Sequence, residues 1–335
     1  MGSKFFNKVQ YGLESTRGTA VPATNIWTGQ SVPLSSDTRA EYPEEVFGVR
    51  AASRRASVQQ KEYRGSLNSD HAIFQQMAFP LSCGLKGGVT LAEVTSGQGD
   101  YKGTFTPSLT AANSPEAATI EIVDDVQAYE IEYAMFERLH WACDISQGND
   151  PSPVKFDADF FGRQISAVTA TGSLSLPTPT GMNGKLSRLY LDTAWAGVGG
   201  TEIASLLRSW DFEIITGLHP NHTGSAYDYF THHSEGIIAV MLSFTVESGS
   251  VAAAKYLLQR SQTFQAARLD IVGPQIGSGT NHRLRFDVGG YFEEVSLNDG
   301  DDRGDNLSSF TLKGVYNDTG AKLLQCELTT NTATK

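Results

Sequence analysis

Cysteines, charged residues and long apolar runs are all scarce in this sequence, and each scarcity excludes a class of protein. The three cysteines, Cys83, Cys143 and Cys326, are widely spaced and form no Cys-x-x-Cys pair, which argues against a disulfide framework or a zinc ribbon. No apolar run approaches the ~20 residues that span a bilayer, and the first residues lack the apolar stretch of a secretory signal. We therefore expect a protein that is made in the cytoplasm and does not enter a membrane.

The charge balance is acidic. The chain of 335 residues has 26 Lys and Arg against 37 Asp and Glu, for a net charge of −11. Surfaces that hold nucleic acid by neutralising phosphates are basic, so a DNA-binding surface is not expected. The same balance is compatible with a protein past which DNA moves without being held.

Patterns of catalytic and metal-binding residues are also missing. The sequence has no Gly-x-Ser-x-Gly elbow, phosphate loop or His-Glu-x-x-His motif. His219, His222, His232 and His233 flank a polar stretch without a nearby cysteine or paired acid, which predicts a solvated loop rather than a zinc site. The acidic turn at residues 298–306 does not have the spacing of a calcium loop. We predict no catalytic residue, no metal and no cofactor.

The patterns that are present are mainly those of β-strands. Alternating or β-branched runs, separated by Gly, Asn, Asp and Pro, predict strands. These are expected at Val58–Leu67, Ala118–Val123, Tyr129–Tyr133, Phe136–Asp144, Val154–Phe161, Ile237–Glu247, Gln265–Val272, Arg283–Val288, Tyr291–Leu297 and Leu307–Tyr316. Helices are expected at Ser69–Met77 and Ser250–Arg260, which begin with a capping serine, and a short one at Thr201–Arg208.

The order of these elements indicates an internal repeat. In each half, a strand leads into a helix, several strands follow, and a polar turn precedes a last strand. A stretch rich in Pro and Gly, Thr169–Gly184, separates the two series. The sequence therefore predicts two tandem β-rich domains with one helix each, at residues 1–172 (with an N-terminal arm) and 173–335.

Three passages resemble one family, the major tail proteins that form the tail tube of siphophages. Tyr11–Thr24 is similar to the family's opening, which often carries a Glu-Ser/Thr-x-Gly-Thr-Ala/Pro-Val stretch; Arg17 stands where Tyr is frequent. Leu189–Gly217 is similar to the mid-chain pattern, in which a Gly-Thr step precedes a strand ending in Gly. The series from Arg283 to Tyr316 is similar to the closing strands. Together they cover nearly the whole chain.

This resemblance implies a fold and a function. The expected fold is mainly β, with two tandem tail-tube-like β-sandwich or barrel domains, each flanked by one α-helix. The expected function is that of a non-enzymatic subunit that assembles into stacked rings around a lumen for DNA, in a phage virion made in the bacterial cytoplasm. With two domains per chain, the ring would be a trimer with pseudo-sixfold symmetry. Its partners would be further copies, a tape-measure protein and tail-tip or terminator proteins.

Two groups of residues are candidates for these roles. Two long polar excursions, Asp37–Arg55 and His219–Glu235, and the N-terminal arm Gly2–Gln10 are expected to stack one ring on the next. The ring-stacking candidates are Arg39, Glu41, Tyr42, Glu44, Glu45, Arg50, Arg54, Arg55, Tyr227 and Tyr229. Acids on predicted strands would make the lumen negative, so that it repels the DNA backbone. The lumen candidates are Glu130, Glu132, Glu137, Asp211, Glu213, Asp287, Glu293 and Glu294.

Two alternatives remain open. One is another phage virion protein, such as a decoration or tail-tip protein, that binds a surface and does not polymerise. The other is a hydrolase on a β scaffold, using Glu130 with Glu132 or His140 with Asp144 as an acid–base pair. The basic cluster Arg50–Arg55 is a plausible docking surface for acidic residues of a neighbour.

Overall fold

The computed structural model describes residues 7–30, 32–124, 126–145, 152–204, 206–300 and 304–335. These residues form a mainly β structure with large antiparallel sheets and two α-helices. The strands of the first half are β1 (Lys8–Leu13), β2 (Asn25–Trp27), β3 (Thr38–Glu41), β4 (Ser57–Lys61), β5 (Tyr63–Ser69), β6 (Ala92–Glu93), β7 (Tyr101–Phe105), β8 (Ala118–Val123), β9 (Ala128–Asp144), β10 (Lys155–Gly162) and β11 (Ile165–Val168). Those of the second half are β12 (Ser187–Asp192), β13 (Leu207–Ile215), β14 (Leu218–Asn221), β15 (His232–Glu235), β16 (Ala239–Glu247), β17 (Gln265–Gln275), β18 (Asn281–Gly300), β19 (Asn306–Gly314) and β20 (Leu324–Thr330).

Seven strands form one long antiparallel sheet that runs through both halves. Its order is β5–β10–β9–β13–β16–β19–β18. The halves join where β9 pairs with β13, from Arg138 opposite Ile215 to Asp144 opposite Ser209. We call this sheet the long sheet.

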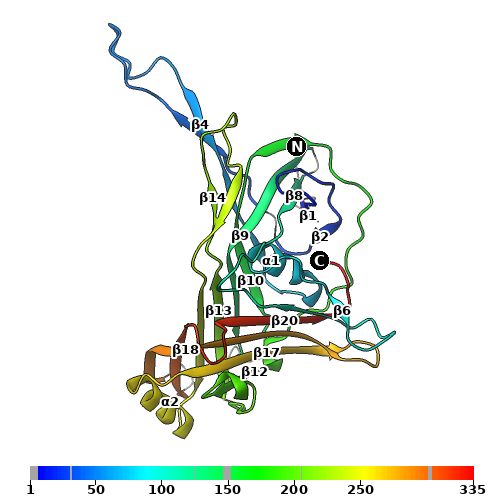
Figure 1. Cartoon of the computed structure of the whole chain (residues 1–335), viewed down its shortest axis with the longest axis vertical. Coiled ribbons are helices and arrows are strands. Elements are labelled where there is room, and N and C mark those ends of the chain that lie inside the picture. The colour runs from blue at the N-terminus through cyan, green and yellow to red at the C-terminus, as the bar shows by residue number, and fades with distance from the viewer. Residues whose placement is uncertain (1–6, 31, 125, 146–151, 205, 301–303) are drawn as a thin grey trace.

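The two longest strands, β9 and β18, each belong to two sheets. The first part of β9 pairs with β8 and β11, next to β1 and β2. The first part of β18 pairs with β17 and β20, and this second sheet continues to β12 on one side and to β7 and β6 on the other. Its strands cross those of the long sheet (Figure 1).

The same pairing order occurs in both halves. Strand β9 pairs with β8 through its first part and with β10 through its second, and β10 pairs with β5. In the second half, β18 pairs in the same way with β17 and β19, and β19 pairs with β16. The outer strands β1 and β12 also correspond, because they pair with β8 and β17. In each half a helix lies between the equivalent strands β5 and β8 or β16 and β17.

Aromatic side chains fill the space between the two sheets. Trp141 of β9 and Phe212 of β13 lie on the covered face of the long sheet, with ring centroids 4.8 and 4.3 Å from Phe286 of the second sheet. One buried hydrophobic cluster includes residues of both halves. Burying a large aromatic side chain stabilises a fold by about 2–3 kcal/mol, so this face holds the sheets together.

The helices agree only in part with the sequence predictions. Helix α2 (Ser250–Arg260) is confirmed. The helix predicted at Ser69–Met77 is wrong: Ser69 ends β5 opposite Phe156, and α1 begins later, at Ala78, and ends at Gly84. The helix predicted at Thr201–Arg208 is also wrong, because Glu202 bridges to Tyr190 of β12 and β13 begins at Leu207.

The predicted strand pairs that flank a bend are single long strands. The two runs Tyr129–Tyr133 and Phe136–Asp144 are both parts of β9, and Arg283–Val288 and Tyr291–Leu297 are both parts of β18. In β9 the bend coincides with Tyr133, which has a φ of 56°. Both sheet and core continue across residue 172, and the division into two domains stays a prediction.

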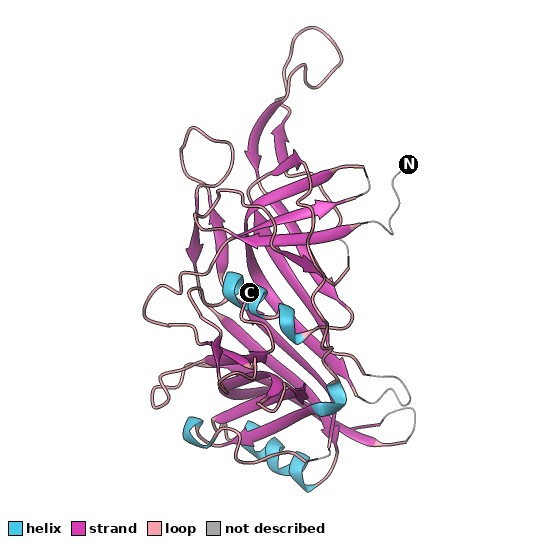
Figure 2. Cartoon of the chain, turned by 90° about the vertical axis from the view of Figure 1, so that its right-hand side faces the viewer, coloured by secondary structure: helices cyan, strands magenta, loops and turns pink. Residues whose placement is uncertain are grey.

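Two hairpins project at one end of the molecule. The first, residues 38–61, contains β3 and β4 and extends away from the body (Figures 1 and 2). The second, residues 218–235, contains β14 and β15 and meets the first at its base, where Lys61 bridges to Tyr229. Among the described residues, no helix is long and apolar enough to cross a membrane.

Candidate functional site

The face of the long sheet opposite the core is polar and partly exposed to solvent. Along each strand, buried residues alternate with partly exposed ones, as a half-buried sheet requires. In β13, for example, Trp210, Phe212 and Ile214 are buried, whereas Asp211 and Glu213 point to the other side. We call this side the open face.

A network of charged side chains covers the open face where the two halves join. The guanidinium of Arg138 donates to Glu213 on the second-half side, at 2.5 Å, and to Asp157 on the first-half side, with Asp159 at 3.3 Å. These hydrogen bonds connect β10, β9 and β13. We call these strands the charged section.

His140 follows Arg138 by two residues in β9, on the same face, and each of its ring nitrogens is hydrogen-bonded to a carboxylate. Its Nδ1 is 2.6 Å from Asp157 Oδ1, and its Nε2 is 2.6 Å from Asp211 Oδ2. The hydrogen bonds to Asp157 and Asp211 outweigh the effect of burial and raise the pKa of His140 to about 9. At neutral pH the imidazole is therefore a cation whose two N–H groups both donate hydrogen bonds, so it is not available as a general base. Four carboxylates thus share two cations, so the section keeps a negative excess.

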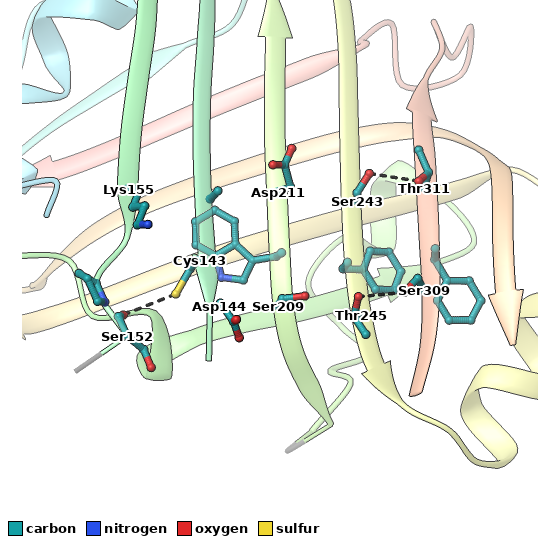
Figure 3. Close-up of a pocket in the computed structure, with 15 residues that line it drawn as sticks. Cys143, Asp144, Ser152, Lys155, Ser209, Asp211, Ser243, Thr245, Ser309 and Thr311 are labelled. Atoms are coloured by element: carbon teal, nitrogen blue, oxygen red, sulfur yellow. Dashed lines mark hydrogen bonds between the residues drawn. The ribbon is translucent and has the colours of Figure 1, made fainter. Parts of the chain in front are cut away.

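The open face of β16 and β19 is lined by hydroxyls instead. Ser243 and Thr311 are 3.1 Å apart and Thr245 and Ser309 are 3.0 Å apart, each pair joining the two strands (Figure 3). We call these strands the hydroxyl section. A hollow of about 640 Å³ extends over it and over β13, β9 and β10. The open face is therefore concave, with charged side chains on one side and neutral ones on the other.

The predicted lumen acids are divided between several places. Asp211 and Glu213 belong to the charged section, and Glu137 forms a bidentate pair with Arg64. Glu293 pairs with Lys313 at 2.8 Å, and Glu294 is exposed opposite Thr311.

Three of the candidates do not lie on the open face. Glu130 and Glu132 are in the first part of β9, beside β8 and β11. Asp287 is 3% exposed in the second sheet, where Arg268 donates two hydrogen bonds to it. Its charge is therefore balanced inside the protein.

The ring-stacking candidates of the first hairpin are mostly exposed. Glu45 accepts Arg55 at 3.0 Å and lies 3.7 Å from Arg54. Tyr42 is 70% exposed. Arg39, Glu41, Glu44 and Arg50 are also exposed.

In the second hairpin, Tyr229 is used within the chain. The Arg163 guanidinium lies 5.1 Å from its ring, and Tyr227 stacks on it at 4.9 Å. Of the predicted N-terminal arm, Gly2–Phe6 lies outside the described residues, and Lys8–Gln10 belongs to β1.

The opening motif has a structural role. The buried carboxylate of Glu14 accepts the backbone N–H groups of Gly18, at 2.5 Å, and Tyr133, at 2.7 Å. Arg163 donates to the carbonyl of Gly18, which has a φ of 73° and where an added Cβ would collide with that guanidinium. The motif therefore fixes the loop after β1 to the bend of β9.

Neither the His140–Asp144 pair nor a histidine metal site is formed among the described residues, whereas burial raises the pKa of both Glu130 and Glu132. His140 binds Asp157 and Asp211 rather than Asp144, and His222 binds Glu62 at 2.8 Å. Within the part of the chain that the structure describes, no group of three or more His, Cys, Asp and Glu side chains could hold a metal ion. Of the acidic turn, residues 301–303 lie outside the described residues.

Sequence reasoning missed most of the open face. Arg138, Asp157 and Asp159 were not candidates, and neither were the serines and threonines of the hydroxyl section. The alternation in Lys155–Ala158 predicts that Asp157 lies on the face of its strand away from the buried residues. Its partner Arg138 could not be identified without knowing that β9 pairs with β10.

No protein-family model matches the chain, and no curated protein is significantly similar to it.

Proposed function

We propose that the chain is the structural subunit of a phage tail tube, without enzymatic activity, and that it assembles into stacked rings that are trimers with pseudo-sixfold symmetry. The observation that carries this proposal is the long sheet, whose strands come from both halves in the same pairing order and whose open face is concave and polar. Each half of the chain contributes one part of the long sheet, so three copies would place six such parts around one axis.

The edges of the long sheet support lateral assembly. Among the described strands, β5 pairs only with β10, although Asn68 on its outer edge accepts the backbone N–H of Gln30 at 2.8 Å, and the last part of β18 pairs only with β19. Unpaired strand edges invite pairing with another chain, and closure into a barrel removes them. The β18 edge of one copy would meet the β5 edge of the next, with the open faces lining a common lumen.

The composition of the open face suits a channel for DNA. Acids without a partner would repel the phosphates, and a basic surface would hold them. Here Arg138 and His140 neutralise part of the acidic charge, and hydroxyls line the neighbouring strands. DNA would slide through such a lumen without specific contacts. The tape-measure, tail-tip and terminator proteins are the further partners of this proposal, and the virion is the location.

The test is to add positive charge to the open face of assembled tubes. Ser243→Lys with Thr311→Lys should give tubes that bind DNA, with an affinity that falls steeply as salt rises, because both side chains would enter the lumen. Thr104→Lys with Thr319→Lys is the matched control, since both threonines are exposed elsewhere. Sedimentation of tubes with labelled DNA measures both. Equal DNA binding by the two variants would contradict an open face that lines the lumen.

A further inference from the structure

Within the chain, the hairpin of the second half docks on the first half. Lys61, at the end of β4, donates its N–H to the carbonyl of Asp228 at 2.7 Å, and its ammonium lies 3.0 Å from the Asp228 carboxylate. Lys61 also forms a β-bridge with Tyr229. Beside it, Arg163 donates to the carbonyl of Phe230 at 2.9 Å. The hairpin 218–235 is therefore held by the end of β4 and by the residue that follows β10.

The second half contains the same receiving positions. Arg163 follows Gly162 of β10 and donates its N–H to the carbonyl of Glu132 at 3.0 Å; Val315 follows Gly314 of β19 and donates to Gly289 at 2.8 Å. Arg163 therefore corresponds to Val315. Because β5 corresponds to β16, Lys61 corresponds to the residues before β16, Ile237 and Ile238.

These positions are apolar and exposed in a single copy. Ile237 is 90% exposed, Tyr316 46% and Val315 38%. Ile237 and Tyr316, together with Ile238 and Leu109, line a groove of about 1110 Å³, and Val315 adjoins Tyr316. Exposed apolar groups gathered in one groove mark an interaction site more often than a solvated surface.

The first hairpin has side chains to fill this groove. In the first hairpin Thr38 pairs with Lys61, as Leu218 pairs with Glu235 in the second hairpin. Counted from these closing pairs, which shift the strand alignment above by two to three residues, Tyr42 takes the place of His222, and Arg54 and Arg55 take that of Asp228 and Tyr229. Tyr42 is 70% exposed, and the two arginine side chains are 71% and 69% exposed. The arginines are opposite in charge to Glu235, which lies two residues before Ile237. The Glu235 carboxylate also accepts the backbone N–H groups of Asn113 and Ser114, and Arg17 lines the same groove.

We propose that the hairpin 38–61 of one copy docks in the groove at Ile237–Ile238 and Val315–Tyr316 of a neighbouring copy, as the hairpin 218–235 docks on Lys61 and Arg163 within the chain. The inference rests on the proposed function, because it requires copies to sit side by side as the two halves do. The occupant is a second copy because the hairpin extends away from the body of its own chain (Figures 1 and 2). In this arrangement the first hairpin forms a contact between neighbouring copies of the same ring.

Engineered cysteines test the contact directly. The bridge between Lys61 and Tyr229 predicts a Cα separation that a disulfide can span. Ile237→Cys combined with Arg54→Cys or with Arg55→Cys should therefore yield covalent trimers on non-reducing gels after mild oxidation. The cysteines Cys83, Cys143 and Cys326 are buried, and Ile237→Cys with Thr104→Cys is the control, which should remain monomeric on the gel.

A charge in the groove provides an independent readout. Ile237→Asp should raise the concentration needed for ring formation at least tenfold, measured by light scattering, whereas Val94→Asp, at a site 47% exposed elsewhere, should not. Rings that form normally from Ile237→Asp, together with no cross-link, would overturn the docking and leave the proposed function standing. A native chain that stays monomeric at all concentrations would overturn both.

Discussion

The charged section and the hydroxyl section lie on the same face of the same sheet, yet they are lined in different ways. In the charged section, Arg138 and His140 connect carboxylates across three strands at the join between the halves. In the hydroxyl section, neutral pairs such as Ser243 with Thr311 face the same hollow. The difference shows that the strands at and beside the join carry charges that must be balanced, whereas β16 and β19 face the hollow with neutral hydroxyl pairs.

The magnitudes agree with this view. Ion pairs between partly exposed groups contribute about 0–1 kcal/mol each, and cross-strand hydroxyl pairs about 0.2–1 kcal/mol. Neither section holds the sheet together, which is the role of Trp141, Phe212 and Phe286 on the covered face. The open face therefore contributes less to stability than the covered face, which is compatible with the lumen proposed above.

Removal of Arg138 should have the largest effect on stability. Arg138→Ala leaves Asp157, Asp159 and Glu213 close together without their shared cation, so we expect the free energy of unfolding to fall by about 1–3 kcal/mol. Lys313→Ala is the control in the hydroxyl section, where the pair with Glu293 is more exposed; it should cost less than ~0.5 kcal/mol. Equal losses in urea titrations would remove the distinction between the sections.

A pH titration should show the contribution of His140. Because its pKa is raised to about 9, the stabilisation is complete below the unfolded value of ~6.5 and is lost as the pH rises through 9. We expect a loss on the order of 1–2 kcal/mol after allowance for solvent screening. Urea midpoints measured from pH 6 to 10 should show this fall in the native protein and not in His140→Gln. His219→Gln, at an exposed histidine, should retain it.

Loss of the hydroxyls should have the smallest effect. Ser243→Ala with Thr311→Ala removes one cross-strand pair whose atoms are partly exposed, so the free energy of unfolding should change by less than ~1 kcal/mol. The thermal midpoint measures this change. A loss as large as that of Arg138→Ala would show that the hydroxyl section is itself a stabilising network.

Local patterns predicted single elements well and contacts between them poorly. Helix α2 and strand β8 have the predicted bounds, because an alanine-rich run and a β-branched run are strong local signals; the N-cap of α2 is Gly249, however, and no side chain caps the helix. The helix expected at Ser69 failed because pairing with Phe156 across 87 positions outweighed the capping signal. The contact of Arg138 with Glu213 likewise depends on the pairing of β9 with β13, which no local pattern contains.

Negative-stain electron microscopy of the purified protein over a concentration series tests the central claim most directly. The account predicts hollow rings, three heavy repeats in each class average and, at higher concentration, stacked tubes. Compact particles without a lumen at every concentration would contradict it and favour a virion protein that binds a surface without polymerising.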